Sequence, residues 1–188
     1  MNKYPELENL VKIVKILDEL EIPYYITGGF AVTTYGRPRF TADIDIVIKM
    51  ANLAVNDFSQ KVQDVFPQGY VDKDLIEHAL KYKSEFNVID PESGLKFDFF
   101  ITNQSDFEKS AFSRLKTKNI DYDVKFISAE DLIISKLLWF RESQSTRQLE
   151  DIKSVIDTQS ELDQKYINDW IEKLELNSEW QALRKIKD

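Results

Sequence analysis

The sequence predicts an α/β protein in which helices flank a mixed β-sheet and a helical extension follows at the C-terminal end. Short β-prone runs alternate with segments whose apolar residues recur every three or four positions, which is the spacing of one helix face. Two of the β-prone runs are interrupted by aspartates, Asp43 and Asp45 in one and Asp98 in the other. The 188 residues are enough for a sizeable buried core within one compact unit.

The first part of the chain is predicted as helix, strand, glycine turn and helix. Leucine and valine residues recur at helical spacing after Pro5, and this helix is expected to end near Glu21. The β-prone run at residues 24–26 stops at Gly28 and Gly29, where a second apolar helical segment begins. This order is typical of a strand that leads into a helix through a tight turn.

The middle of the chain supplies the remaining strands. Two of them are joined across residues 90–94, Asp-Pro-Glu-Ser-Gly, a composition typical of a hairpin turn. Together with the strand before the double glycine, these give an expected sheet of about four or five strands. The predicted elements are a strand at residues 41–48, a helix at 50–66, and strands at 86–89, 95–101 and 124–127.

The last third of the chain is predicted as helix throughout. A capping box that begins at Ser128 precedes a long apolar helical segment. Breaks near residues 141–146 and 158–163 divide the remainder of the chain into further helices. We therefore expect a core of residues 1–127 and a helical extension of residues 128–188 packed on it.

Composition excludes several kinds of site. The chain has no cysteine and a single histidine, His78, so it has neither disulfides nor the ligands of a structural zinc site. A formal charge of −8 disfavours binding to long DNA, although a bound cation would reverse the local field for a smaller anion. No run approaches the ~20 apolar residues of a membrane span, and no signal peptide is evident. We expect a cytoplasmic protein that does not bind membranes.

Asp43, Asp45 and Asp98 form the first candidate site. Residues two apart on a strand face the same side, so Asp43 and Asp45 would repel each other within an apolar strand unless a cation neutralised them. Asp98 lies in a second apolar strand, where an unpaired charge is again costly. Oxygen ligands alone favour Mg²⁺ or Mn²⁺. The alternative is an exposed sheet face on which the acids are solvated.

Two neighbouring features could bind phosphate. Gly28 and Gly29 allow backbone N–H groups to approach a ligand at the positive end of a helix, or they form a tight turn without a ligand. Arg37 and Arg39 precede the acidic strand, and Arg39 is the better candidate for a triphosphate contact. The alternative for both arginines is a solvated basic loop.

In their order along the chain, these residues resemble the signature of the DNA polymerase beta-like nucleotidyltransferase superfamily. That signature is a small-residue turn, a helix, paired acids on a strand and a third acid on a later strand. The match covers roughly the first two-thirds of the chain and is closest to small prokaryotic nucleotidyltransferase-like proteins, relatives of abortive-infection toxins among them. One position departs from the pattern: many polymerase-type members have Gly-Ser in the turn, so a hydroxyl contact to the triphosphate is missing at Gly29.

The resemblance implies a Mg²⁺-dependent (or Mn²⁺-dependent) nucleotidyltransferase that moves a nucleoside monophosphate from an NTP to a hydroxyl of a small molecule, a protein or an RNA end. Asp43, Asp45 and Asp98 would bind metal, and Asp98 would also help to deprotonate the acceptor hydroxyl. Two alternatives stay open: a non-catalytic nucleotide-binding or antitoxin-like module of the same fold, and a phosphohydrolase with the same metals. The implied nucleotide contacts are Gly28, Gly29, Arg39, Thr41 and Lys136.

The predicted helices of the extension carry four further residues of interest. Lys136 lies in an otherwise apolar helix, where it would either neutralise phosphate or pair with Asp131 or Asp151. Arg147 and Asp151 are four residues apart, which predicts an ordinary ion pair on the helix surface. Trp139 is expected in the core or an interface. The acceptor, the preferred base and the oligomeric state stay open.

Overall fold

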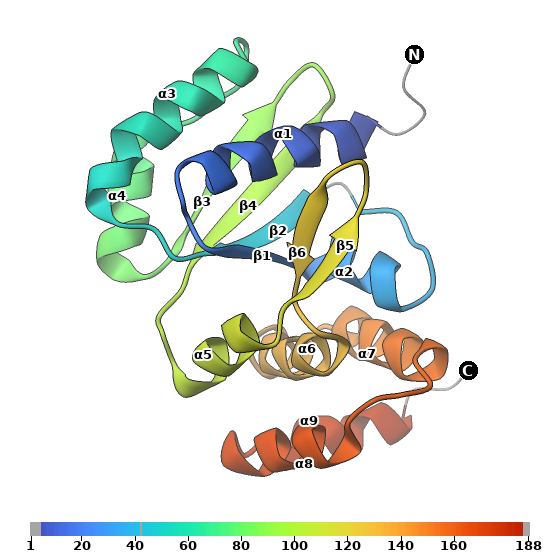
Figure 1. Cartoon of the computed structure of the whole chain (residues 1–188). Coiled ribbons are helices and arrows are strands. Elements are labelled where there is room, and N and C mark those ends of the chain that lie inside the picture. The colour runs from blue at the N-terminus through green and yellow to red at the C-terminus, as the bar shows by residue number, and fades with distance from the viewer. Residues whose placement is uncertain (1–4, 42, 186–188) are drawn as a thin grey trace.

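A mixed six-stranded β-sheet forms the centre of the computed structural model, which describes residues 5–41 and 43–185 (Figure 1). The strands are β1 (Tyr24–Thr27), β2 (Asp43–Ile48), β3 (Glu85–Asp90), β4 (Leu95–Ile101), β5 (Lys116–Asn119) and β6 (Asp123–Phe126). Their order across the sheet is β3-β4-β2-β1-β6-β5. β2 is parallel to β4 and β1 to β6, whereas the other neighbours are antiparallel. The predicted mixed sheet is confirmed.

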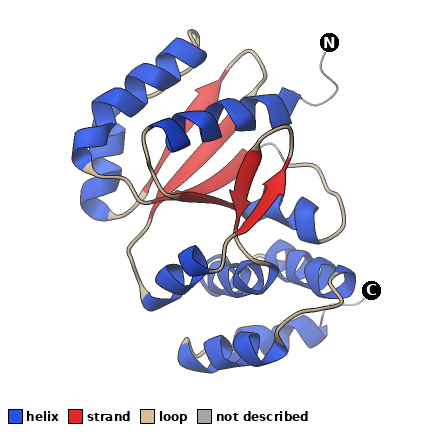
Figure 2. Cartoon of the chain, in the orientation of Figure 1, coloured by secondary structure: helices blue, strands red, loops and turns tan. Residues whose placement is uncertain are grey.

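Helices cover both faces of this sheet (Figure 2). In Figure 1, α1, α3 and α4 lie on one side, while α5, α6 and α7 lie on the other, with α8 and α9 beneath them. The helices are α1 (Pro5–Glu19), α2 (Gly28–Tyr35), α3 (Val55–Val65), α4 (Lys73–Tyr82), α5 (Asp106–Ser113), α6 (Ala129–Ser143), α7 (Thr146–Thr158), α8 (Gln164–Lys173) and α9 (Asn177–Ala182), with 3₁₀ turns at Asn52–Ala54 and Leu183–Lys185. In the described part of the chain, none of them has the length and apolar character needed to cross a membrane.

The expected number of about four or five strands was too low, because β5 was missed. All four residues of β5 are exposed, so the strand has no alternation of apolar and polar side chains. It is a strand because its backbone pairs with β6. The predicted strand at residues 41–48 is observed from Asp43 onward, and Ala42 lies outside the described residues.

The two faces of the central strands differ in chemistry. On β4, Phe97 and Phe99 are fully buried and contact aromatic rings of α3 and the segment after it. The alternate residues Asp98 and Phe100 face the other side, where the Phe100 ring lies 5.8 Å from the ring of Trp139 in α6. One face of the sheet is therefore an aromatic core, and the opposite face carries the acids.

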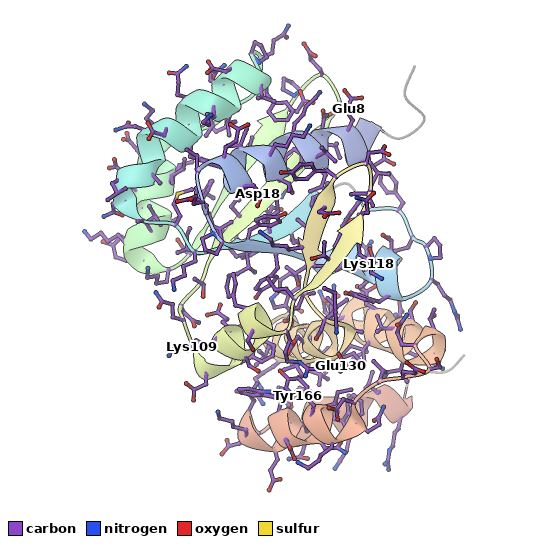
Figure 3. The ribbon with its side chains drawn as sticks, viewed as in Figure 1. Glu8, Asp18, Lys109, Lys118, Glu130 and Tyr166 are labelled. Atoms are coloured by element: carbon purple, nitrogen blue, oxygen red, sulfur yellow. The ribbon has the colours of Figure 1, made fainter. Side chains whose placement is uncertain are left out.

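A polar network joins α8 to α6 and to Arg114. Figure 3 labels Tyr166, which comes from α8, and Glu130, the neighbour of Asp131 in α6. The Tyr166 hydroxyl of α8 donates to the carboxylate of Asp131 in α6, and the Arg114 guanidinium lies 3.8 Å from the centre of the Tyr166 ring. Ser128 caps α6 by accepting a hydrogen bond from the backbone N–H of Asp131 at 3.1 Å, as predicted. These contacts tie α8 to α6 and to Arg114, the residue that follows α5.

Candidate active site

Three acids lie on one face of the sheet. Asp45 of β2 is directly opposite Asp98 of β4, and Asp43 is two residues before Asp45, so all three side chains leave the sheet on the same side. Directly opposite positions on neighbouring strands bring side chains within about 5 Å of each other, and like charges at such positions are destabilising. Asp45 is buried, while Asp43 and Asp98 are half-buried.

The site holds more negative charge than its protein donors balance. Burial raises the pKa of Asp45 to about 6, the charge of Asp43 adds to this rise, and the charge of Asp98 contributes in the same direction. Lys136 and the backbone N–H of Gly29 oppose the shift without cancelling it. A nearby cation would therefore stabilise the ionised form of Asp45.

Lys96 is the local counter-ion of these acids. Its Nζ lies 2.7 Å from Oδ2 of Asp98, and the residue is directly opposite Asp43. The hydrogen bond to Asp98 raises the pKa of Lys96, and the charges of Asp43 and Asp45 add to the rise against the effect of burial. Sequence reasoning missed Lys96, although its position two residues before Asp98 already predicted the same face.

The fit of the acids to a metal ion depends on their side-chain positions and their chemistry. As the side chains lie, no group of three or more acids or histidines in the described part of the chain is close enough to hold one. Asp98 instead pairs with Lys96, and Oδ1 of Asp43 accepts a hydrogen bond from Thr41 Oγ1 at 2.8 Å. The donor chemistry still fits Mg²⁺, because carboxylate oxygens with surplus negative charge are the ligands that this ion prefers.

The double glycine allows the start of α2 to approach Asp45. Gly28 has a φ of +62°, and a Cβ atom there would lie 1.6 Å from Oδ2 of Asp45. Any side chain at Gly28 would therefore be strained and would also overlap the carboxylate. The N–H of Gly29 donates to the same oxygen at 3.3 Å.

Arg39 and Thr41 lie against Gly29. A Cβ atom on Gly29 would be 2.8 Å from Nη2 of Arg39 and 2.9 Å from Oγ1 of Thr41. The absence of a side chain at Gly29 thus makes room for a guanidinium and a hydroxyl group at the start of α2. Four of the residues implied to contact nucleotide are brought together here: Gly28, Gly29, Arg39 and Thr41.

A fourth acid, Asp151, holds two further cations beside the site. Arg39 binds it through two hydrogen bonds, of 2.8 and 2.9 Å, and Nζ of Lys136 lies 2.8 Å from its Oδ2. Lys136 and Asp151 are both buried, and burial is the main cause that lowers the pKa of Lys136. The predicted ion pair between Arg147 and Asp151 was wrong, because Asp151 lies on the buried face of α7, where it pairs with Arg39 and Lys136.

Comparison with known protein families shows which family the chain belongs to. Residues 6–187 match the model of a family described as nucleotidyl transferase of unknown function, DUF2204. The chain belongs to this family. The resemblance noted in the sequence is therefore confirmed, and the match includes the C-terminal helices as well as the motif-bearing part. No curated protein matches the sequence.

Solved structures with the same fold include other nucleotidyltransferases. The antibiotic-resistance factor ANT(2'')-Ia has a TM-score of 0.61 and 14% identity over 98% of this chain and 97% of its own. The lincosamide antibiotic adenylyltransferase LnuA, solved with lincomycin, has a TM-score of 0.54 and 18% identity over 81% and 97%. An antigenic nucleotidyltransferase-like protein from Paracoccidioides brasiliensis has a TM-score of 0.53 and 23% identity over 95% of this chain and 93% of its own. At these identities the likeness shows the fold.

The raised pKa of Asp45 predicts how stability depends on pH. The folded state binds a proton at Asp45 more tightly than the unfolded chain does, so Asp45 costs the protein stability as pH rises from about 4 to above 6. In EDTA, Asp45→Asn should therefore stabilise the protein by on the order of 2 kcal/mol at pH 7.5 and by much less at pH 4.5. Urea unfolding at both pH values measures this.

Glu77→Gln is the matched control, because Glu77 is an exposed residue of α4, a helix on the other side of the sheet from α6. It should change stability little at either pH. If Asp45→Asn destabilised the protein at pH 7.5, the carboxylate would be held by protein donors and would play a structural part.

Proposed function

We propose that the protein is a Mg²⁺-dependent nucleotidyltransferase that transfers a nucleoside monophosphate from an NTP to a hydroxyl of an acceptor molecule. The observation that carries this proposal is the shared face of Asp43, Asp45 and Asp98, beside the N-terminal end of α2. Membership of a nucleotidyltransferase family supports the reaction class. The three acids would hold Mg²⁺, which would neutralise the charge of the phosphates and of the attacking oxygen.

The protein's part in the reaction depends on the position of Asp98. The acceptor oxygen would attack the α-phosphorus, the bond from that phosphorus to the oxygen bridging to the β-phosphate would break, and pyrophosphate would leave. Asp98 would take the proton of the acceptor hydroxyl. In this structure it is occupied by Lys96, so catalysis requires this ion pair to open.

The start of α2 and the cations beside it would bind the phosphates. Backbone N–H groups at a helix N-terminus favour an anion, and Arg39 and Lys136 are held nearby by Asp151. Thr41 would supply the hydroxyl that the Gly-Gly turn lacks once it turns from Asp43, to which it now donates, because its Oγ1 lies 2.9 Å from the point where a side chain of Gly29 would begin. A hydroxyl from the neighbouring loop would thus take the place of the serine hydroxyl that the Gly-Gly turn lacks.

One observation favours a second function, that of a non-catalytic nucleotide-binding or antitoxin-like module. Lys96 pairs with Asp98, and Asp151 pairs with both Arg39 and Lys136, so most charged side chains of the site already have a partner within the protein. Incubation with an α-labelled NTP separates the possibilities. Label transferred to an acceptor indicates the transferase, label released only as free nucleotide indicates a phosphohydrolase, and saturable binding without turnover indicates the module.

We predict that Mg²⁺ and an NTP together raise the melting temperature far more than either does alone. The triphosphate supplies metal ligands that the three acids do not, and the metal screens the acids from the phosphates. Thermal scans with each component and with both measure the effect. No shift at millimolar concentrations of both would remove the nucleotide site.

We also predict that affinity and rate separate among the three acids. Asp43→Asn and Asp45→Asn should abolish Mg²⁺-dependent NTP binding, whereas Asp98→Asn should retain most of the affinity and lose transfer. The physical reason is that Asp98 would act on the attacking oxygen, mainly in the transition state. Calorimetric titration gives the affinity, and single-turnover transfer to a small-molecule extract gives the rate.

The control for this series is Asp74→Asn, which changes an exposed acid of α4 outside the site. Equal loss of NTP affinity in all three site variants would contradict the division of roles. Full transfer by Asp98→Asn would show that another group accepts the proton.

A further inference from the structure

A cavity of about 510 Å³ opens on the same face of the sheet as the three acids. Thr27, directly opposite Asp45, and Phe100, two residues after Asp98, both belong to its lining. The cavity therefore begins where the acids end and continues between the sheet and α6. Its lining comes from β1 (Tyr25, Thr27), β2 (Val47), β4 (Phe100, Ile101), α6 (Ser135, Leu138, Trp139) and the segments at residues 83–85 and 103–108.

Hydroxyl groups without a protein partner line this cavity. Tyr25 is 2% exposed and Thr27 3% exposed, and neither side chain hydrogen-bonds to another residue in the described part of the chain. The Tyr25 hydroxyl has no hydrogen-bond partner among the described residues and is not completely buried, so it is open to the cavity. Ser135, across the cavity on α6, likewise has no partner there.

These hydroxyls form a row that leads away from the acids. Tyr25 and Thr27 are two apart on β1, so their side chains point to the same side, next to Asp45. Hydroxyl groups that reach a cavity and have no protein partner are free to bind water or a ligand there. A ligand that carries several hydroxyl groups would satisfy them together.

The charge of the lining selects against anions. Glu85 is exposed, with no ion-pair partner in the described part of the chain, and Glu108 is half-buried, where its Oε2 accepts hydrogen bonds from Thr102 and Ser105. Lys83 is the cation among the lining residues, and Asp45 and Asp98 adjoin the inner end. The balance is negative, as is the formal charge of −8 of the whole chain. An RNA end would be repelled here, whereas an ammonium group would be attracted.

The remaining wall is aromatic. Phe100 and Trp139 are half-buried, with ring centres 5.8 Å apart and an angle of 44° between the ring planes. Trp139 was expected in the core or an interface, but part of it faces the cavity. Aromatic rings of this kind cover the apolar face of a small ring compound and also attract a cation.

We propose that this cavity is the acceptor site and that the acceptor is a small polyhydroxylated amine of the amino-sugar class. Its hydroxyl groups bind Tyr25, Thr27 and Ser135, its ammonium group faces Glu85 and Glu108, and one hydroxyl reaches the acids at the inner end. The cavity lies within the size range of small-ligand sites. The assignment of an acceptor rests on the proposed transferase function.

The test is a titration of the full chain with three matched sugars, glucosamine (cationic), N-acetylglucosamine (neutral) and gluconate (anionic), without nucleotide or metal. Binding is followed by the indole N–H signal of Trp139 in NMR spectra, assigned with Trp139→Phe. Glucosamine should shift this signal in a saturable manner, N-acetylglucosamine should bind more weakly, and gluconate should cause no shift. Glu85→Gln should reduce the preference for glucosamine over N-acetylglucosamine.

Tyr25→Phe and Tyr24→Phe form a matched pair on β1. Tyr25→Phe removes a hydroxyl that has no protein partner among the described residues, so the protein should fold and bind glucosamine about 3- to 10-fold more weakly, the loss of one hydrogen bond. Tyr24→Phe should leave glucosamine binding unchanged, because Tyr24 points to the opposite face of the sheet, where its hydroxyl accepts from the backbone N–H of Lys125. Melting temperatures confirm that both variants fold.

Three outcomes would overturn the assignment: no shift of Trp139 with any sugar, gluconate binding as well as glucosamine, or equal effects of the two tyrosine variants. Failure of the proposed function is seen separately, with α-labelled ATP and Mg²⁺ added. Saturable glucosamine binding at Trp139 without transfer of label to the sugar would contradict the proposed transferase function. It would still support the assignment of amino sugars as ligands of the cavity.

Discussion

The parallel pairing of β2 with β4 brings two carboxylates directly opposite each other, and the surrounding residues are arranged around that charge. Gly28 has no side chain because Oδ2 of Asp45 occupies the space, and the N–H of Gly29 points at the same oxygen. Lys96 approaches from the neighbouring strand. Asp45 still keeps a pKa of about 6, so the repulsion is only partly relieved.

Asp151 holds two cations of the site, Arg39 and Lys136, in position before any ligand binds. Asp151 is buried in α7 and fixes Arg39, from the loop before β2, and Lys136, from α6. Side chains held in this way lose less conformational entropy when they bind phosphate, which is the advantage of preorganisation. Removing Asp151 would leave Lys136 buried without its partner, and it would also break the pair with Arg39 that ties α7 to the loop before β2.

Periodicity and turn chemistry were enough to predict the mixed sheet, the hairpin and the common face of Asp43 and Asp45, because these depend on local spacing. The register that sets Asp45 against Asp98 depends on pairing between distant strands, and no local pattern encodes it. Asp151 was misassigned because the four-residue spacing to Arg147 takes no account of which helix face is buried. The cavity beside the acids arises from several separate segments and was not predicted.

The most direct measurement is a crystal structure of the protein with Mn²⁺ and a non-hydrolysable NTP, with data collected at the manganese absorption edge. If the three acids form the metal site, an anomalous peak lies among the carboxylates of Asp43, Asp45 and Asp98, and Lys96 has moved away from Asp98. A nucleotide bound elsewhere, or a bound nucleotide with Lys96 still paired to Asp98 and no anomalous peak at these carboxylates, would contradict this.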